Sequence, residues 1–172
     1  MAQSDFLDLD CLAYATRRTG RAVTNVFNAR LAGLDLNVSQ FGLLAAVARR
    51  PGASLATIGE AMLLDNSTLA RNFAVMERRK LIAAEGGRGR GGKSLNLTKA
   101  GEKLFNEALV IWRMTNRQLA AKIGAEETAA GRVFLRALGA AAEQLKQTEK
   151  PQEKSEAAAA RVGAHRRIRS RA

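Results

Sequence analysis

A glycine-rich basic segment between two short apolar runs is the feature of this sequence that most restricts the possible folds. Residues 86–93 comprise five glycines and three cations, and they separate the apolar run 81–85 from the alternating segment 94–97. Two such runs joined by a glycine-rich loop predict a β-hairpin. The other apolar patterns have a helical period. We therefore expect a mainly α protein with one small β-hairpin.

Helical periodicity and capping residues define the other elements. The expected helices cover residues 6–34, 40–50, 55–62, 66–79, 99–123 and 126–146. Ser39, Ser54 and Thr98 are expected to cap the second, third and fifth helices, and either Asp65 or Asn66 the fourth.

The fourth expected helix has two distinct faces. Leu69, Phe73 and Met76 recur at i, i+4 and i+7, which predicts a buried face. The opposite face then shows small polar side chains and one arginine. Its members are Ser67, Thr68, Arg71 and Asn72.

The positive charge is concentrated in two blocks. The chain has 28 Lys and Arg against 16 Asp and Glu, a net charge of +12. Residues 66–99 hold +6 and residues 146–172 hold +5 of this excess. Two such blocks favour a polyanionic partner, either nucleic acid or an acidic membrane surface.

The C-terminal block lies in a segment with few large apolar side chains, residues 147–172. We expect a disordered basic tail there, because the segment cannot bury enough apolar surface to order itself. The tail either adds nonspecific phosphate contacts or serves only as a solubilising extension.

Other residue counts exclude several classes of protein. A single cysteine and a single histidine argue against a disulfide framework, a zinc site or a catalytic triad. We expect no metal, no cofactor and no enzymatic activity. The chain shows neither a membrane-spanning apolar run nor a signal peptide, so we expect a cytoplasmic protein without a membrane partner.

The order helix, short helix, polar-faced helix, strand, basic loop, strand is that of a winged helix-turn-helix. Such a module places its polar-faced helix in the major groove of duplex DNA. There Ser67 and Thr68 could donate to phosphates or base edges, and Arg71 could pair with guanine or hold a phosphate. In the hairpin loop, the wing, Arg88 and Arg90 could enter the minor groove, with Lys93 adding charge.

Four stretches of the sequence resemble the MarR family of bacterial transcription regulators. They are Leu36–Leu44, Leu64–Asn72, Met76–Ile82 and Leu97–Gly101, and the resemblance covers roughly residues 10–120. It implies one MarR-type domain over residues 1–146, with a DNA-binding module at 35–98.

The resemblance also implies how such a protein works. Helices 6–34 and 99–146 would form a homodimer whose two modules read a pseudo-palindromic operator. Arg71 and Arg90 fall where the family has its recognition-helix and wing arginines, although Gly89 replaces the aspartate that usually precedes the wing arginine. The family's commoner mode is repression, relieved by a small molecule, often an aromatic acid, or by oxidation.

Two other interpretations of the basic loop remain open. Gly87–Ser94 matches the P-loop pattern G-x-x-x-x-G-K-[ST] of nucleotide-binding proteins. That interpretation requires a helix from Lys93, whereas Leu95 and Leu97 alternate like a strand. Alternatively, the arginine and glycine tract could bind single-stranded RNA.

Three residues outside the module are candidates for sensing an effector. Cys11 lies near the start of the first helix, with Tyr14 one turn away, and some peroxide-sensing family members use a cysteine there. Trp112 in the fifth helix could line a pocket for a small aromatic effector. The alternative is that Cys11 and Trp112 are simply packed apolar residues.

Overall fold

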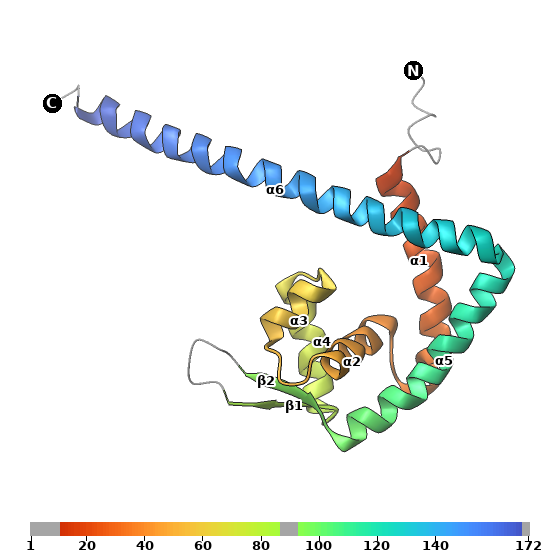
Figure 1. Ribbon diagram of the computed structural model, residues 1–172. Coiled ribbons are helices and arrows are strands. Elements are labelled where there is room, and N and C mark those ends of the chain that lie inside the picture. The colour runs from red at the N-terminus through yellow and green to blue at the C-terminus, as the bar shows by residue number, and fades with distance from the viewer. Residues whose placement is uncertain (1–10, 87–92, 170–172) are drawn as a thin grey trace. The chain divides into compact units, whose positions relative to one another are not determined.

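The computed structural model describes residues 11–86 and 93–169 (Figure 1). These residues form α1 (Leu12–Leu31), η1 (Ala32–Leu34), α2 (Val38–Arg49), α3 (Leu55–Met62), α4 (Asn66–Arg78), β1 (Ile82–Glu85), β2 (Ser94–Leu97), α5 (Lys99–Ile123) and α6 (Ala125–Arg169). The predicted fold class, mainly α with a small β-hairpin, is confirmed. The chain divides into two compact units, Met1–Gln118 and Leu119–Ala172.

The first helix is shorter than predicted within the described residues. It begins at Leu12, after Cys11, and residues 6–10 of the predicted span lie outside the described residues. Its C-terminal end tightens into the 3₁₀ turn η1, and Asp35 then adopts a left-handed conformation with φ 51°. The Asp35 N–H donates to the Ala32 carbonyl over 2.9 Å, which ends the turn.

The cap of α2 corrects one prediction. Ser39 was the expected N-cap, but the helix begins at Val38 and Asn37 caps it. The Asn37 side chain accepts from the Gln40 N–H over 2.9 Å, and the Gln40 side chain accepts from the Asn37 N–H over 3.1 Å. Because this reciprocal pair satisfies two main-chain donors at once, it determines where the helix starts.

Two other predicted caps are confirmed. The Ser54 hydroxyl accepts from the Thr57 N–H over 3.2 Å at the start of α3. The Thr98 hydroxyl accepts from the Gly101 N–H over 3.0 Å at the start of α5.

The hairpin is attached to the turn before α3. β1 and β2 pair antiparallel, with Ile82 opposite Leu97 and Glu85 opposite Ser94. An isolated bridge joins Ser54 to Ser94, and the Leu95 N–H donates to the Ala53 carbonyl over 3.0 Å. The end of β2 nearest the loop is therefore held next to the N-terminus of α3.

The core of the first unit draws on every element from α1 to β2. Its largest fully buried side chains include Leu31, Leu43, Leu44, Ile58, Met76, Ile82 and Leu95. Leu69 is also buried and Phe73 packs against the cluster, as predicted for the inward face of α4. Burying this face leaves the polar side of α4 directed outward.

Two glycines allow close approach of main chain in this unit. A Cβ atom at Gly59 of α3 would lie 2.6 Å from a methyl carbon of Leu69 on α4. A Cβ atom at Gly101 would overlap the carbonyl oxygen of Leu81. A leucine side chain can rotate away, whereas the Leu81 carbonyl belongs to the chain between α4 and β1.

The second unit is dominated by α6. Gly124, with φ +105°, separates α5 from α6. The predicted helix 126–146 forms, but the backbone stays helical to Arg169, which differs from the disordered tail predicted for 147–172. That segment is rich in Ala, Glu, Gln, Lys and Arg, residues that favour a helix.

Within the part of the chain that the structure describes, no single helix is long and apolar enough to cross a membrane. One bent pair, Leu12–Leu34 with Val38–Arg49, meets that test by length and composition only.

The contact between Gly101 and Leu81 leads to a stability prediction. Replacing Gly101 with Ala places a methyl group against a main-chain oxygen, so the free energy of unfolding should fall by about 1–3 kcal/mol. Chemical denaturation of the purified protein measures this change.

Gly20→Ala is the matched control, since nothing lies within 4 Å of a Cβ atom at Gly20 in α1. That variant should be neutral or more stable by up to about 1 kcal/mol, because alanine favours the helix. Equal unfolding free energies for the two variants would contradict the close approach at Gly101.

Candidate nucleic-acid interface

The N-terminal end of α4 is organised by Asp65. Its carboxylate oxygen Oδ1 accepts from the Ser67 hydroxyl over 2.6 Å and from the Thr68 N–H over 2.8 Å. The Ser67 hydroxyl and then the Thr68 N–H hold the pKa of Asp65 well below its usual range, because both donors favour the ionised form. Of the two predicted caps, Asp65 is the one observed.

The hydrogen bond to Asp65 changes what Ser67 can offer. A serine hydroxyl carries one proton, and here Ser67 donates that proton to the carboxylate. Ser67 therefore presents only acceptor lone pairs to the surroundings. The donor role predicted for it toward a phosphate or base would require the side chain to leave Asp65.

The remaining polar residues of α4 differ in their freedom to bind a ligand. Arg71 is exposed, one turn into the helix, and makes no hydrogen bond or ion pair with the described residues. Thr68 is half-buried. Asn72 is also half-buried, and its Nδ2 donates to the Thr68 carbonyl over 3.0 Å. Arg71 is thus the cation on this face with the most freedom to reach a ligand.

A tight turn sets the position of α4 relative to α3. Leu63 follows α3 in a left-handed conformation with φ 51°, and its N–H donates to the Glu60 carbonyl. The Leu64 N–H donates to the Gly59 carbonyl over 3.3 Å, and α4 begins at Asn66. With the Gly59–Leu69 contact, this turn forms a closely packed helix-turn-helix.

The predicted wing residues are only partly described. Arg88 and Arg90 lie outside the described residues. Lys93 is exposed and directly precedes β2, which begins at Ser94. The P-loop interpretation required a helix from Lys93 onward, so the observed strand removes the structural context on which it depended.

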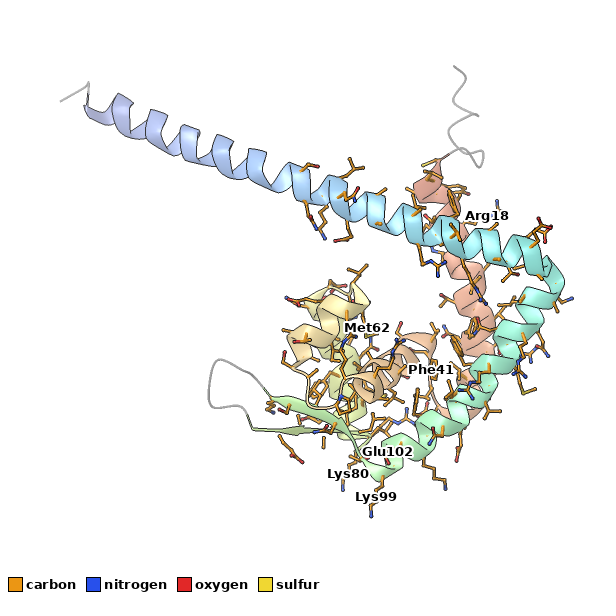
Figure 2. The ribbon with its side chains drawn as sticks, in the orientation of Figure 1. Arg18, Phe41, Met62, Lys80, Lys99 and Glu102 are labelled. Atoms are coloured by element: carbon orange, nitrogen blue, oxygen red, sulfur yellow. The ribbon has the colours of Figure 1, made fainter. Side chains whose placement is uncertain are left out.

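The three predicted sensing residues lie at the start of α1 and in α5. Cys11 is half-buried at the N-cap of α1, and Tyr14 is exposed on the next turn. Trp112, 37% exposed, stacks on Phe41 with ring centroids 6.1 Å apart, and Phe41 also stacks on Phe105. Figure 2 labels Phe41 on α2. The Trp112 ring thus extends an aromatic stack between α2 and α5.

A cavity of about 330 Å³ lies farther along this interface and does not include Trp112. The C-terminal part of α2, β2 and the first turns of α5 surround it. Its lining residues are Val47, Ala48, Pro51, Asn96, Leu97, Glu102, Phe105 and Asn106.

Sequence reasoning missed two interactions at the ends of α4. The Asp65–Ser67 bond has a local signal, since Asp and Ser at a helix N-terminus readily make hydrogen bonds to groups close to them in sequence. The second is at the other end, where the Arg79 guanidinium donates to the carbonyls of Leu34 and Asp35. These residues are more than forty positions away in sequence, and no local pattern indicates that contact.

Comparison with known proteins gives a consistent result. A sequence model described as the MarR family matches residues 34–91. The transcriptional regulator MosR of M. tuberculosis superposes with a TM-score of 0.70 at 26% identity, over 78% of this chain and 97% of MosR. MosR in complex with DNA matches over the same shares, with a TM-score of 0.70 at 27% identity.

A second regulator superposes equally well. PcaV from Streptomyces coelicolor, in complex with its natural ligand, has a TM-score of 0.69 at 25% identity, over 83% of this chain and 99% of PcaV. A comparison with curated proteins finds no match.

The depressed pKa of Asp65 makes stability depend on pH. Because the folded state holds Asp65 ionised, the unfolded chain binds a proton there more readily. Its stabilising contribution is present above the ordinary carboxyl pKa and is lost as the pH falls. The wild-type free energy of unfolding should therefore drop more steeply than that of Asp65→Asn between about pH 5 and about pH 2.

Asn at position 65 still caps the helix but cannot ionise, so the comparison isolates the charge. Glu60→Gln, which removes an exposed carboxylate from α3, is the matched control for the loss of one negative charge. Parallel profiles for wild type and Asp65→Asn would show that this carboxylate is not held ionised by the fold.

Proposed function

We propose that this chain, whose residues 34–91 match the MarR family and whose fold is similar to that of the regulator MosR, represses transcription as a homodimer on a pseudo-palindromic DNA operator. In this proposal the dimer acts in the cytoplasm, and a small molecule or an oxidant releases it from DNA. No catalytic step is involved.

The outward face of α4 is the observation that carries the proposal. Its apolar side is buried in the core, its N-terminus is capped, and Arg71 extends from the exposed side. A helix presented in this way fits the major groove. Lys93, exposed just before β2, adds positive charge on the hairpin, and the minor-groove role of Arg88 and Arg90 stays a prediction, because both lie outside the described residues. MosR, which shares this fold at 27% identity, has been solved with DNA.

Exposed apolar side chains support the homodimer. Among the described residues, all but one of the large exposed apolar side chains lie on α1, α5 and α6. They are Leu12, Tyr14, Val23, Val26, Val110, Trp112, Met114, Ile123, Val133, Phe134, Leu135 and Leu145, and the exception is Leu63. Helices that expose this much apolar surface need a partner, and a second copy of the chain is the simplest one.

The effector part of the proposal rests on one similar protein and on two groups of side chains in this chain. PcaV was solved with its natural ligand, and in this chain the aromatic stack of Trp112 on Phe41 offers a surface for a small aromatic molecule. Cys11, close to the exposed Tyr14, is the candidate for oxidation.

Arg71 provides the main test. If it reads a base, Arg71→Ala should weaken binding to the specific duplex by about 1–3 kcal/mol and relax preference at one base position. If it holds a phosphate, binding should weaken about equally on all sequences. A duplex selected from a random pool by the wild-type protein, titrated by fluorescence anisotropy, measures both.

Arg30→Ala serves as the control, because it removes the same charge from α1, outside the winged-helix module. Unchanged affinity of Arg71→Ala on every duplex would remove Arg71 from the interface. Tighter binding to single-stranded RNA than to duplex DNA at physiological salt would favour the RNA-binding alternative instead.

The basic C-terminal segment makes a separate contribution in this proposal. Ending the chain after Lys146 should flatten the dependence of log affinity on log salt, by about one unit of slope for each phosphate that the segment neutralises. Titrations at several salt concentrations measure this slope, and an unchanged slope would show that residues 147–172 do not touch DNA.

A further inference from the structure

The C-terminal end of α4 is joined by side-chain hydrogen bonds to the ends of two other helices. On one side lies the corner between α1 and α2, and on the other lies the start of α5. Both connections use main-chain carbonyls as acceptors, so they fix backbone positions directly.

The first connection is made by Arg79, the C-cap residue of α4. Its Nη1 donates to the Asp35 carbonyl, and its Nη2 donates to the Leu34 carbonyl over 3.4 Å. The guanidinium is planar and charged, so two acceptors on adjacent residues also restrict its orientation.

The carboxylate of Asp35 adds little to this connection. It lies 3.6 Å from Arg79 Nη1, but it is 93% exposed, whereas the Arg79 side chain is only 25% exposed. An ion pair with one partner so open to water is strongly screened. The two carbonyl acceptors therefore account for the connection.

The segment between α1 and α2 to which Arg79 donates is itself held by hydrogen bonds. Asp35 is held in the left-handed region, and the Leu36 N–H donates back to the Leu31 carbonyl. From α1, the Asn28 side chain accepts from the Val38 N–H over 2.8 Å at the start of α2. A displacement of the end of α1 must therefore move this corner as a unit.

The second connection is made by Thr98. Its hydroxyl donates to the Lys80 carbonyl over 2.7 Å, and its N–H donates to the Leu81 carbonyl over 3.1 Å. Figure 2 shows Lys80 and Lys99 at this junction. The turn after α4 is thus joined to the first turn of α5, where Gly101 packs against the same Leu81 carbonyl.

We propose that Arg79 is a positioning residue that sets the angle of α4 relative to α1, and thereby selects the spacing between the two half-sites that the dimer accepts. The inference rests on the proposed function, in which α1 belongs to the dimer and α4 enters the groove. Two α4 helices held at fixed angles by one dimer fit half-sites at one separation only.

The test uses the full-length protein and a duplex that the wild type selects from a random pool. Variants of that duplex carry one or two base pairs inserted or removed between the half-sites, and a further duplex carries a single half-site. Arg79→Gln should lower the discrimination between the selected and altered spacings by about 2- to 30-fold, the range by which connecting side chains change coupling between distant sites.

Affinity for the single half-site should stay within about twofold, because Arg79 touches α1–α2 rather than the reading face. A residue needed only for stability would lower binding to all duplexes alike. Arg79→Lys keeps the charge and a single donor nitrogen, so it should restore part of the discrimination.

Arg78→Gln is the matched control. It removes the same charge one residue earlier, from an exposed side chain with no hydrogen bond among the described residues. It should leave spacing discrimination as in the wild type.

Unchanged discrimination in Arg79→Gln, or an equal loss in Arg78→Gln, overturns the proposal. Failure of both Arg79 variants to fold also overturns it, since Arg79 would then be a residue of general stability. If the wild type selects no duplex, the proposed function fails instead, and that result is separate from these.

Discussion

The burial of one side of α4 is the constraint on which the rest of the structure depends. Leu69 and Met76 lie in the core formed by α1, α2, α3 and the hairpin, so α4 cannot rotate without exposing them. The side that remains outside carries Ser67 and Arg71. The chemistry available to a ligand is therefore a consequence of core packing, and the caps and turns at each end determine where that side is presented.

Much of the fold was predictable because its signals are local. Apolar periodicity indicated the helices, and Ser54 and Thr98 marked helix starts through hydrogen bonds to residues three positions away. The error at Ser39 arose because two capping signals overlapped, and the reciprocal Asn37–Gln40 pair outcompetes a single serine. The extent of α6 was missed because burial was weighed above intrinsic helix propensity.

The candidate site was predictable only in part, for a related reason. The polar face of α4 follows from the spacing of its apolar residues, so Arg71 could be placed outside. The direction in which the Ser67 hydroxyl donates its proton depends on the rotamer of Asp65. The hydrogen bonds from Arg79 to the carbonyls of Leu34 and Asp35 depend on the tertiary fold. A sequence pattern shows which donors and acceptors the chain has. The hydrogen bonds within the fold determine which of those donors and acceptors remain available to a ligand.

The close contacts at Gly59 and Gly101 differ in the substitutions that the chain can accommodate. Gly59 faces a side chain, so a larger residue there can be accommodated when Leu69 becomes smaller, and the two positions can change together in evolution. Gly101 faces the carbonyl of Leu81, which every residue at position 81 would retain. No second substitution at that contact can compensate for added bulk. In related sequences, paired substitutions at positions 59 and 69 can therefore change the contact between α3 and α4. The start of α5, by contrast, requires glycine at position 101.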